Sequence, residues 1–215
     1  MLELIHNPVN LSYAKSPEYS ATSAYYIEGY VLIRKLDFTK SLIIHYTYDH
    51  KTWFTSPATF LTATKDNHEV WYFKTPNTYN HSSCSFALCY KVNDKEYWDN
   101  NQSMNYSLKW YSPTKALQNC AIVLDKAFRS SDTFYGNILI KNLAYHKQIK
   151  VCYSFDEWET FTEVDAVHSC QFSNNLENWT FSAPLSFSCE IRFVVYYIVN
   201  GITYFDNNFG MDYFI

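Results

Sequence analysis

The stretch Tyr97-Trp98-Asp99-Asn100-Asn101 returns 107 positions later as Tyr204-Phe205-Asp206-Asn207-Asn208. Each copy is followed, at the same spacing, by a second short motif: Met104-Asn105-Tyr106 in the first and Met211-Asp212-Tyr213 in the second. The same offset relates Gly29 to Gly136 further upstream. A repeat of this length is too long for a solenoid unit and has the size of one small domain. The chain of 215 residues is therefore predicted to hold two related domains in tandem.

Aromatic residues are the unusual feature of the composition, because 20 Tyr, 16 Phe and 6 Trp make up 20% of the chain. Aromatics favour strands, but two small cores need fewer of them than this. We expect some rings to lie exposed as binding surfaces, apolar on the face and able to hydrogen-bond at the tip. The net charge of −4 provides no basic surface, so neither nucleic acid nor an anionic membrane is expected as a partner.

Short strand signals separated by turn residues run through the whole chain. They predict strands at 9–13, 30–34, 42–48, 70–73, 85–92, 97–98 and 105–108, and in the second copy at 138–140, 149–155, 179–181, 190–199, 202–205 and 212–214. Asn200-Gly201 and Asn93-Asp94 are predicted to be two-residue hairpin turns. The fold class predicted is all-β, with two antiparallel β-sandwich domains at 8–111 and 118–215 and a short link near 109–119.

The six cysteines form no C-x-x-C pair and do not match between the copies. We expect free, buried thiols and a reducing compartment. Residues 1–6 lack the features of a secretory signal. The sequence therefore predicts a cytoplasmic protein, provided that the chain is not a fragment of something larger, and it predicts no cofactor and no metal.

An aromatic residue beside Asp-Asn-Asn in a loop combines two groups that suit a sugar. A glucose ring presents C–H groups on its face and hydroxyls at its edge, which call for a flat apolar surface and for amides. The alternative is a tight β-turn whose side chains bond only their own backbone. Two copies with the ring in the same place favour the sugar interpretation. Asp99 and Asp206 are expected to fix the turn rather than to touch sugar.

The second copy contains the strings 136–147 (GNILIKNLAYHK) and 151–161 (VCYSFDEWETF), followed by Trp179-Thr180-Phe181 and the repeated motif at 204–208. Together they resemble carbohydrate-binding module family 21, which comprises the starch-binding domain of fungal glucoamylases and the glycogen-binding domain of protein phosphatase 1 targeting subunits. The likeness covers about residues 120–215 and is looser over the first copy. The resemblance implies immunoglobulin-like β-sandwiches that bind α-1,4-glucans without catalysis.

The resemblance also implies two binding sites in each copy. In the second copy the first site comprises Trp158, Phe205, Asn207 and Asn208, and the second site Asn142, Tyr145 and Lys147. In the first copy the matching residues are Trp98, Asn100 and Asn101, with Phe38 and Lys40 for the second site and Trp53 standing in for the displaced tryptophan. Phe38 and Tyr145 are expected to be exposed because they lie in polar turns. Trp71 and Trp179 lie in Trp-x-Phe strand patterns and are expected in the cores.

Three other functions compete with simple glucan binding. A glycosidase needs two carboxylates across a cleft, and the acidic residues here are scattered, so no enzyme is expected. A glycogen-targeting subunit of protein phosphatase 1 docks through a short basic-hydrophobic-x-aromatic motif; residues 35–38 and 150–153 fit it only superficially. A protein-interaction sandwich would present its rings without Asn at the rim.

The partners predicted are α-glucans: starch, glycogen, malto-oligosaccharides and cyclodextrin. A catalytic subunit such as protein phosphatase 1 is the alternative partner, and the chain is expected to be a monomer. Two linked modules should bind a polymer much more tightly than a small cyclic glucan. If the chain belongs to a larger amylolytic enzyme, it is expected to be secreted.

Overall fold

The computed structural model describes residues 7–17, 24–109, 115–118, 120–172, 174–185 and 190–215. The chain divides into a first unit, 1–119, and a second unit, 120–215. Cys189 and link residues 110–114 and 119, for which the sequence made predictions, lie outside the described residues. Within the described ranges, no helix has the length and apolar character needed to span a membrane.

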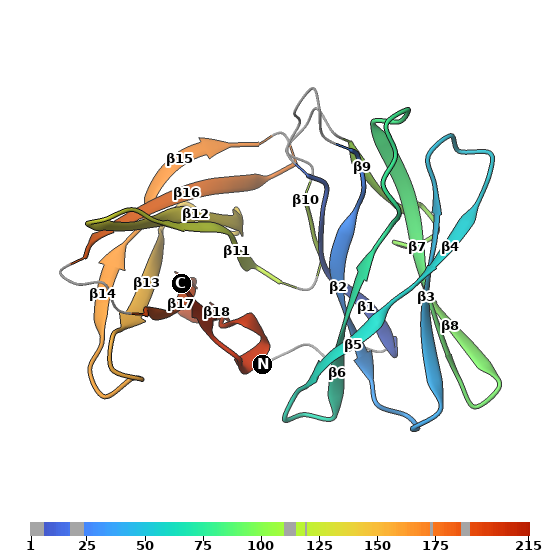
Figure 1. Cartoon of the computed structure of the whole chain (residues 1–215), viewed down its shortest axis with the longest axis horizontal. Helices are drawn as coiled ribbons and strands as arrows, with labels where there is room; N and C mark the ends of the chain where they lie inside the picture. Colours follow the sequence, from blue (N-terminus) through green and yellow to red (C-terminus); the bar gives the residue numbers. More distant parts are fainter. Residues whose placement is uncertain (1–6, 18–23, 110–114, 119, 173, 186–189) are drawn as a thin grey trace. The chain divides into compact units, whose positions relative to one another are not determined.

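The first unit is built from two antiparallel sheets (Figure 1). One has the order β10-β1-β2-β6-β5, from Lys115–Leu117, Val9–Lys15, Glu28–Arg34, His68–Lys74 and Thr59–Ala63. The other has the order β4-β3-β7-β8, with β9 also paired to β7, from Phe54–Pro57, Lys40–Thr47, Ser83–Val92, Lys95–Asp99 and Tyr106–Lys109. The edge strand β10 comes from the segment predicted to be link, and it pairs with β1.

The second unit repeats this plan. Its first sheet has the order β11-β12-β16-β15, from Ile122–Arg129, Thr133–Lys141, Leu176–Pro184 and Val167–Gln171. Its second sheet has the order β14-β13-β17-β18, with β19 also paired to β17, from Thr162–Asp165, Lys147–Ser154, Arg192–Val199, Ile202–Asp206 and Tyr213–Phe214. A single 3-10 turn, Asn208–Gly210, precedes β19. The all-β tandem sandwich predicted from the sequence is confirmed.

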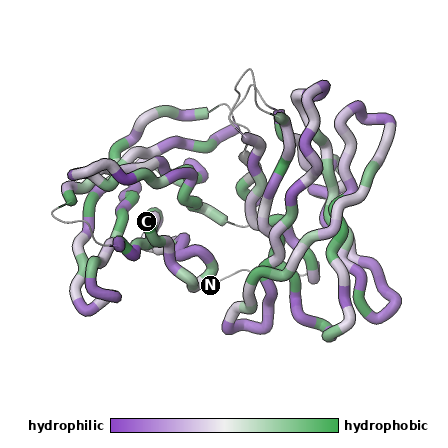
Figure 2. Tube along the Cα trace, in the orientation of Figure 1, coloured by the Kyte–Doolittle hydropathy of each residue, from purple (hydrophilic) through white to green (hydrophobic). Residues whose placement is uncertain are grey.

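Each unit has its own hydrophobic core between its two sheets. In the first unit, Val31 from one sheet and Ile44 and Leu88 from the other are fully buried members of one cluster. In the second unit, Phe134 and Phe193 come from opposite sheets and their ring centroids are 4.7 Å apart. Hydrophilic residues gather at the turns that join the strands (Figure 2). Along the strands, apolar residues that face inward alternate with polar residues that face outward, and this alternation fixes the strand register.

Gly29 and Gly136, which the sequence repeat pairs, have the same structural role in the two units. A Cβ atom on Gly29 would lie 2.8 Å from the Phe73 ring, and one on Gly136 would lie 2.7 Å from the Phe181 ring. Both glycines also face a backbone oxygen of the neighbouring strand, close to a β-bulge in that strand. Only glycine fits there, since any side chain would displace a core phenylalanine.

Both predicted hairpin turns are present. Asn200 and Gly201 have φ values of 51° and 74°, and Asn93 and Asp94 have 51° and 57°. Two consecutive residues with positive φ form the type I′ turn, whose twist matches that of the flanking strands. These turns set β17 against β18 and β7 against β8 in the same register.

The structure corrects the expectation that the thiols are buried. Among the described cysteines, Cys84 and Cys89 are buried, but Cys170 is exposed on the edge strand β15. Burial raises the pKa of Cys84 to about 12. That thiol is therefore chemically inert at neutral pH.

Candidate functional site

A carboxylate anchors each of the repeated Asp-Asn-Asn loops. In the second unit, Asp206 accepts hydrogen bonds from the Leu124 N–H at 2.7 Å and from the Asn208 N–H at 3.2 Å. The Tyr213 hydroxyl donates to both Asp206 oxygens, at 2.9 and 2.8 Å. Burial raises the pKa of Asp206, although these hydrogen bonds act in the opposite direction. Asp206 therefore holds the loop and is not available to a ligand.

The first unit has the same arrangement. Asp99 accepts from the Leu11 N–H at 2.7 Å and from the Asn101 N–H at 3.3 Å. The Tyr106 hydroxyl donates to both Asp99 oxygens, at 2.8 and 2.9 Å. Both aspartates do what the sequence predicted for them, which is to fix the turn.

The Asn side chains of these loops also take part in the turns. Asn207 accepts from the Gly210 N–H with its carboxamide oxygen at 3.0 Å, and Asn100 does the same for the Ser103 N–H at 2.9 Å. Asn208 donates to the Asp212 carbonyl at 3.0 Å. The turn therefore uses one half of the Asn207 and Asn100 amides, and their NH₂ groups are the part that can serve a sugar hydroxyl.

In the second unit, Phe205 lies beside Tyr196, a residue that the sequence reasoning did not select. The two are paired in register on β18 and β17, and their ring centroids are 5.6 Å apart. The Phe205 side chain is 63% exposed, whereas its neighbour Tyr196 is buried. The Tyr196 hydroxyl donates to Glu163 at 2.5 Å, and Glu163 is also bonded to Lys150 at 3.4 Å. Burial, together with this carboxylate, raises the pKa of Tyr196.

Trp158 is tied to the same loop from another direction. Its indole N–H donates to the Asp212 carboxylate at 2.9 Å, and the Asp212 backbone N–H donates to the Asn207 carbonyl at 2.9 Å. Glu157 and Trp158 both have positive φ, 58° and 76°. Residues other than glycine rarely adopt a positive φ. The resulting backbone strain persists where surrounding contacts impose it. We name the set Trp158, Tyr196, Phe205 and Asn207 the hairpin site of the second unit.

The hairpin site of the first unit is built from different residues. Trp98, 42% exposed, takes the place of Phe205. Its register partner is the buried Cys89 rather than a tyrosine, and its ring partner is His45 of β3, at 4.8 Å. Burial and the nearby Lys91 lower the pKa of His45, so this imidazole is neutral near pH 7. We define this hairpin site as Trp98, His45, Asn100 and Asn101.

Trp53 was predicted to stand in for the tryptophan of the second unit, Trp158. The strand register places it elsewhere. Tyr46 pairs with Phe54 in the first unit, and Tyr153 pairs with Thr162 in the second. Trp53 therefore stands at the position of Phe161, while Lys51 stands at that of Trp158. Both Trp53 and Phe161 are exposed, so the two units present a ring at this shared position.

The second pair of predicted rings lies in the loop before β3 or β13. Phe38 is 85% exposed and Tyr145 is 90% exposed. The side chains of Lys40 and Lys147, the lysines predicted for this site, are buried although the rings are exposed. Lys147 donates to Glu177 at 2.7 Å and to the Asn142 carboxamide oxygen at 2.6 Å, and the side chains of the ion pair are each only 6% exposed. Lys147 and Asn142 thus fix the base of the Tyr145 loop.

The first unit contains an equivalent ion pair. Lys40 lies 2.9 Å from Glu69, and the two side chains are 7% and 6% exposed. In both units the other carboxylate oxygen accepts from an indole N–H, Trp71 at 3.0 Å and Trp179 at 2.9 Å. These tryptophans were predicted to lie in the cores; they are partly buried and pack against them. Lys35 takes the place of Asn142 and lies 5.0 Å from the Phe38 ring centroid.

A further ring contacts each of these tryptophans edge to face. Phe60 of β5 lies 6.3 Å from Trp71, and His168 of β15 lies 5.5 Å from Trp179. The two occupy the same register opposite their tryptophans. We name Phe38, Phe60 and the Lys40–Glu69 pair the loop site of the first unit, and Tyr145, His168 and the Lys147–Glu177 pair that of the second. Phe60 and His168 escaped the sequence reasoning because β5 and β15 lack alternation.

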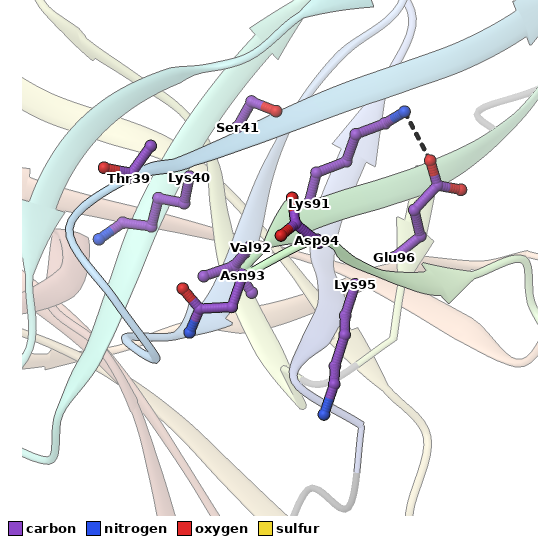
Figure 3. Close-up of a pocket in the computed structure, with 9 residues that line it drawn as sticks. All are labelled: Thr39, Lys40, Ser41, Lys91, Val92, Asn93, Asp94, Lys95 and Glu96. Carbon is purple, nitrogen blue, oxygen red and sulfur yellow. Dashed lines mark ion pairs between the residues drawn. The ribbon is translucent and has the colours of Figure 1, made fainter.

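A surface pocket of about 580 Å³ opens beside the Phe38 loop. Its walls are Thr39, Lys40 and Ser41 at the start of β3 and the whole β7–β8 turn, residues 91–96 (Figure 3). Lys91 and Glu96, on the neighbouring strands β7 and β8, point toward each other, with an N–O distance of 2.6 Å. Among the described residues, no group of three His, Cys, Asp or Glu side chains is placed to hold a metal ion.

Two stretches of the chain, 4–109 and 116–215, each match the model of the carbohydrate/starch-binding module, family 21. The chain belongs to this family. Its members are non-catalytic binding modules, and the double match shows that the repeat seen in the sequence is a tandem of two of them. The resemblance noted from the sequence motifs is therefore confirmed.

The chain is similar to glucoamylase 1 of Rhizopus oryzae, with 36% identity over 99 residues that cover 44% of this chain and 16% of that protein. It is 32% identical over 103 residues to human protein phosphatase 1 regulatory subunit 3B, covering 45% of this chain and 34% of that one. The chain thus spans about a third or less of these two relatives. A solved starch-binding domain of the Rhizopus glucoamylase, in complex with β-cyclodextrin and maltoheptaose, matches 45% of this chain and 92% of its own, with 32% identity and a TM-score of 0.40.

Proposed function

We propose that each unit binds an α-1,4-glucan by stacking glucose on its exposed rings and bonding its hydroxyls with Asn amides. The observation that carries this proposal is the repeated hairpin-site loop. In both units an exposed ring stands directly before an Asp-Asn-Asn turn that a carboxylate and a tyrosine hydroxyl hold in place. A prearranged surface of this kind loses little conformational entropy when it binds a sugar.

The known proteins that match support the choice of sugar. The solved Rhizopus domain was determined with β-cyclodextrin and maltoheptaose, both of which are glucans. Contacts of shallow sites are weak individually, because they bury little surface and must desolvate hydroxyls. Two linked units would make the second contact intramolecular, so a polymer is expected to be bound about 10²–10⁴ times more tightly than a small ring.

Tryptophan fluorescence titration with β-cyclodextrin tests the proposal. Trp158 and Trp98 are partly exposed, so saturable quenching is expected in the wild type, and it should be weakened in Phe205→Ala and Trp98→Ala. Matched controls are Phe128→Ala and Tyr79→Ala, which remove exposed rings outside both the hairpin and loop sites. Absence of any response at millimolar ligand in a folded sample would reject glucan binding.

Targeting of a phosphatase is the second candidate function, because regulatory subunits of protein phosphatase 1 are among the relatives. Residues 150–153 cannot serve as its docking motif, since Val151 and Tyr153 are buried in β13. Residues 35–38 are more accessible, with Leu36 and Phe38 exposed. A pull-down with the catalytic subunit, on wild type and Phe38→Ala, decides this candidate: stable capture lost in the variant would support it.

A further inference from the structure

The pocket beside the Phe38 loop shares only Lys40 with the proposed sites. It is formed where three strand ends meet: Ser41 pairs with Lys91, and Lys91 pairs with Glu96. The I′ turn of Asn93 and Asp94 closes its end. Its volume of about 580 Å³ lies within the range of small-ligand pockets, about 300–1,000 Å³.

The lining of this pocket suits a neutral polyol. Thr39 and Ser41 provide hydroxyls and Asn93 provides an amide, and all three residues are exposed. The charges balance, because Lys91 is paired with Glu96, while Lys95 and Asp94 have opposite signs. Lys40 is already neutralised by Glu69. A pocket with no net charge and many donors and acceptors gives no advantage to an anion, but it matches the hydroxyls of a sugar.

The position of the pocket connects it to the loop site. Thr39 lines the pocket and directly follows Phe38, whose ring is the exposed platform of that site. Phe38 and Thr39 are adjacent in the chain, so a glucan stacked on Phe38 would have a neighbouring glucose unit close to the pocket. We propose that the pocket is an additional subsite, taking one further glucose unit of an α-glucan held on Phe38. This inference rests on the proposed function and extends it.

The second unit has different residues at most positions of this pocket, although Asn200 keeps the place of Asn93. Its hairpin has the same I′ turn and the same register. However, Ile198, Gly201, Ile202 and Thr203 stand where the first unit has Lys91, Asp94, Lys95 and Glu96. The extra subsite is accordingly a property of the first unit alone. The two units should differ in the length of glucan that they prefer.

The test uses the full chain with the other sites disabled by Trp98→Ala, Tyr145→Ala, Trp158→Ala and Phe205→Ala. In this parent, calorimetric titration is expected to show that maltoheptaose binds about fivefold more tightly than maltotriose, the equivalent of one net hydrogen bond. Replacing Lys91, Asp94, Lys95 and Glu96 by Ile, Gly, Ile and Thr gives the first hairpin the second unit's residues, which fit the same turn. This variant is expected to bind both oligosaccharides equally, with unchanged affinity for maltotriose.

The side-chain amides of Asn93 and Asn200 give an independent readout by NMR in the wild type. They hold the same position in the two hairpins, so maltoheptaose should shift the Asn93 signal and leave that of Asn200 in place. A charge-removal control is Lys15→Ile with Glu28→Thr, which removes an ion pair from the other sheet of the same unit. Unchanged length dependence in the hairpin variant, while Phe38→Ala still abolishes binding, would overturn the subsite. Absence of glucan binding in the wild type would overturn the proposed function instead.

Discussion

The Tyr213 hydroxyl donates to both carboxylate oxygens of Asp206, at 2.9 and 2.8 Å, and so connects the last strand to the loop that directly follows Phe205. The repeat of this contact between Tyr106 and Asp99 explains why the motif recurs at a fixed spacing. The tyrosine must follow the aspartate by seven residues for β9 or β19 to pair beside the loop. The conserved spacing within the chain is thus a requirement of the turn, and the ring before it is free to differ.

Asp206→Ala is expected to destabilise the second unit by about 3 kcal/mol. It leaves three donors without their acceptor, the Leu124 and Asn208 N–H groups and the Tyr213 hydroxyl, and each unmet group costs about 1–3 kcal/mol when buried. Urea unfolding measures the loss. The control is Asp165→Asn, an exposed carboxylate of the same unit, which should change the free energy of unfolding little. Equal effects of the two substitutions would contradict the anchoring role.

Lys147→Met is expected to cost about 3–5 kcal/mol, because it leaves the Glu177 carboxylate buried without its cation. The double variant Lys147→Met with Glu177→Met should recover much of this loss, since no charge is then buried. Thermal unfolding of both variants measures the difference. Lys150, on the same strand, forms a more exposed pair with Glu163, so Lys150→Met should cost less than about 1 kcal/mol. A double variant no better than the single one would show that the lysine acts through packing.

The second unit is expected to lose stability in acid. Burial alone would raise the pKa of Glu177, but the hydrogen bonds from Lys147 and Trp179 outweigh it and hold the pKa below its ordinary value. A depressed carboxylate pKa contributes stability that is present above the unfolded value, about 4.3, and is lost as pH falls through the folded value. Unfolding measured between pH 7 and pH 3 should show this loss. Glu177→Gln should flatten the pH dependence of the second unit; an unchanged profile would assign acid sensitivity to other groups.

The parts of the fold that the sequence predicted correctly are those that depend on neighbouring residues alone. Residue type predicts the I′ turns at Asn93 and Asn200, and apolar runs predict the buried strands. The edge strands β5 and β15 were missed because nearly all their residues are exposed, so they show no alternation. The bulge between Leu124 and Lys126 hid β11 in the same way, since it shifts the alternation by one residue.

The candidate site was predictable only where it lies within one loop. Phe205, Trp98 and the Asn pairs follow one another in the sequence, so the motif was visible. Tyr196 was missed because its place beside Phe205 depends on the register of two strands. The role of Lys147 depends on Glu177, thirty residues away, and a lysine in a polar turn gives no sign that it will be buried. Contacts between distant segments are what a sequence alone leaves undetermined.

Phe60 and His168 are the rings that contact Trp71 and Trp179. Replacing each by the residue of the other unit is expected to change glucan affinity in opposite directions. His168→Phe replaces a polar imidazole by an apolar ring, which avoids the cost of desolvating its nitrogens under a sugar, and should strengthen binding about threefold. Phe60→His should weaken it by a similar factor. Both are measured by calorimetry with maltoheptaose, in a background of Trp98→Ala, Trp158→Ala and Phe205→Ala that disables both hairpin sites. Val167→Phe, which adds a ring beside His168 on the opposite face of β15, is the control for added apolar surface. Changes in the same direction for both exchanges would show that these rings do not contact the sugar.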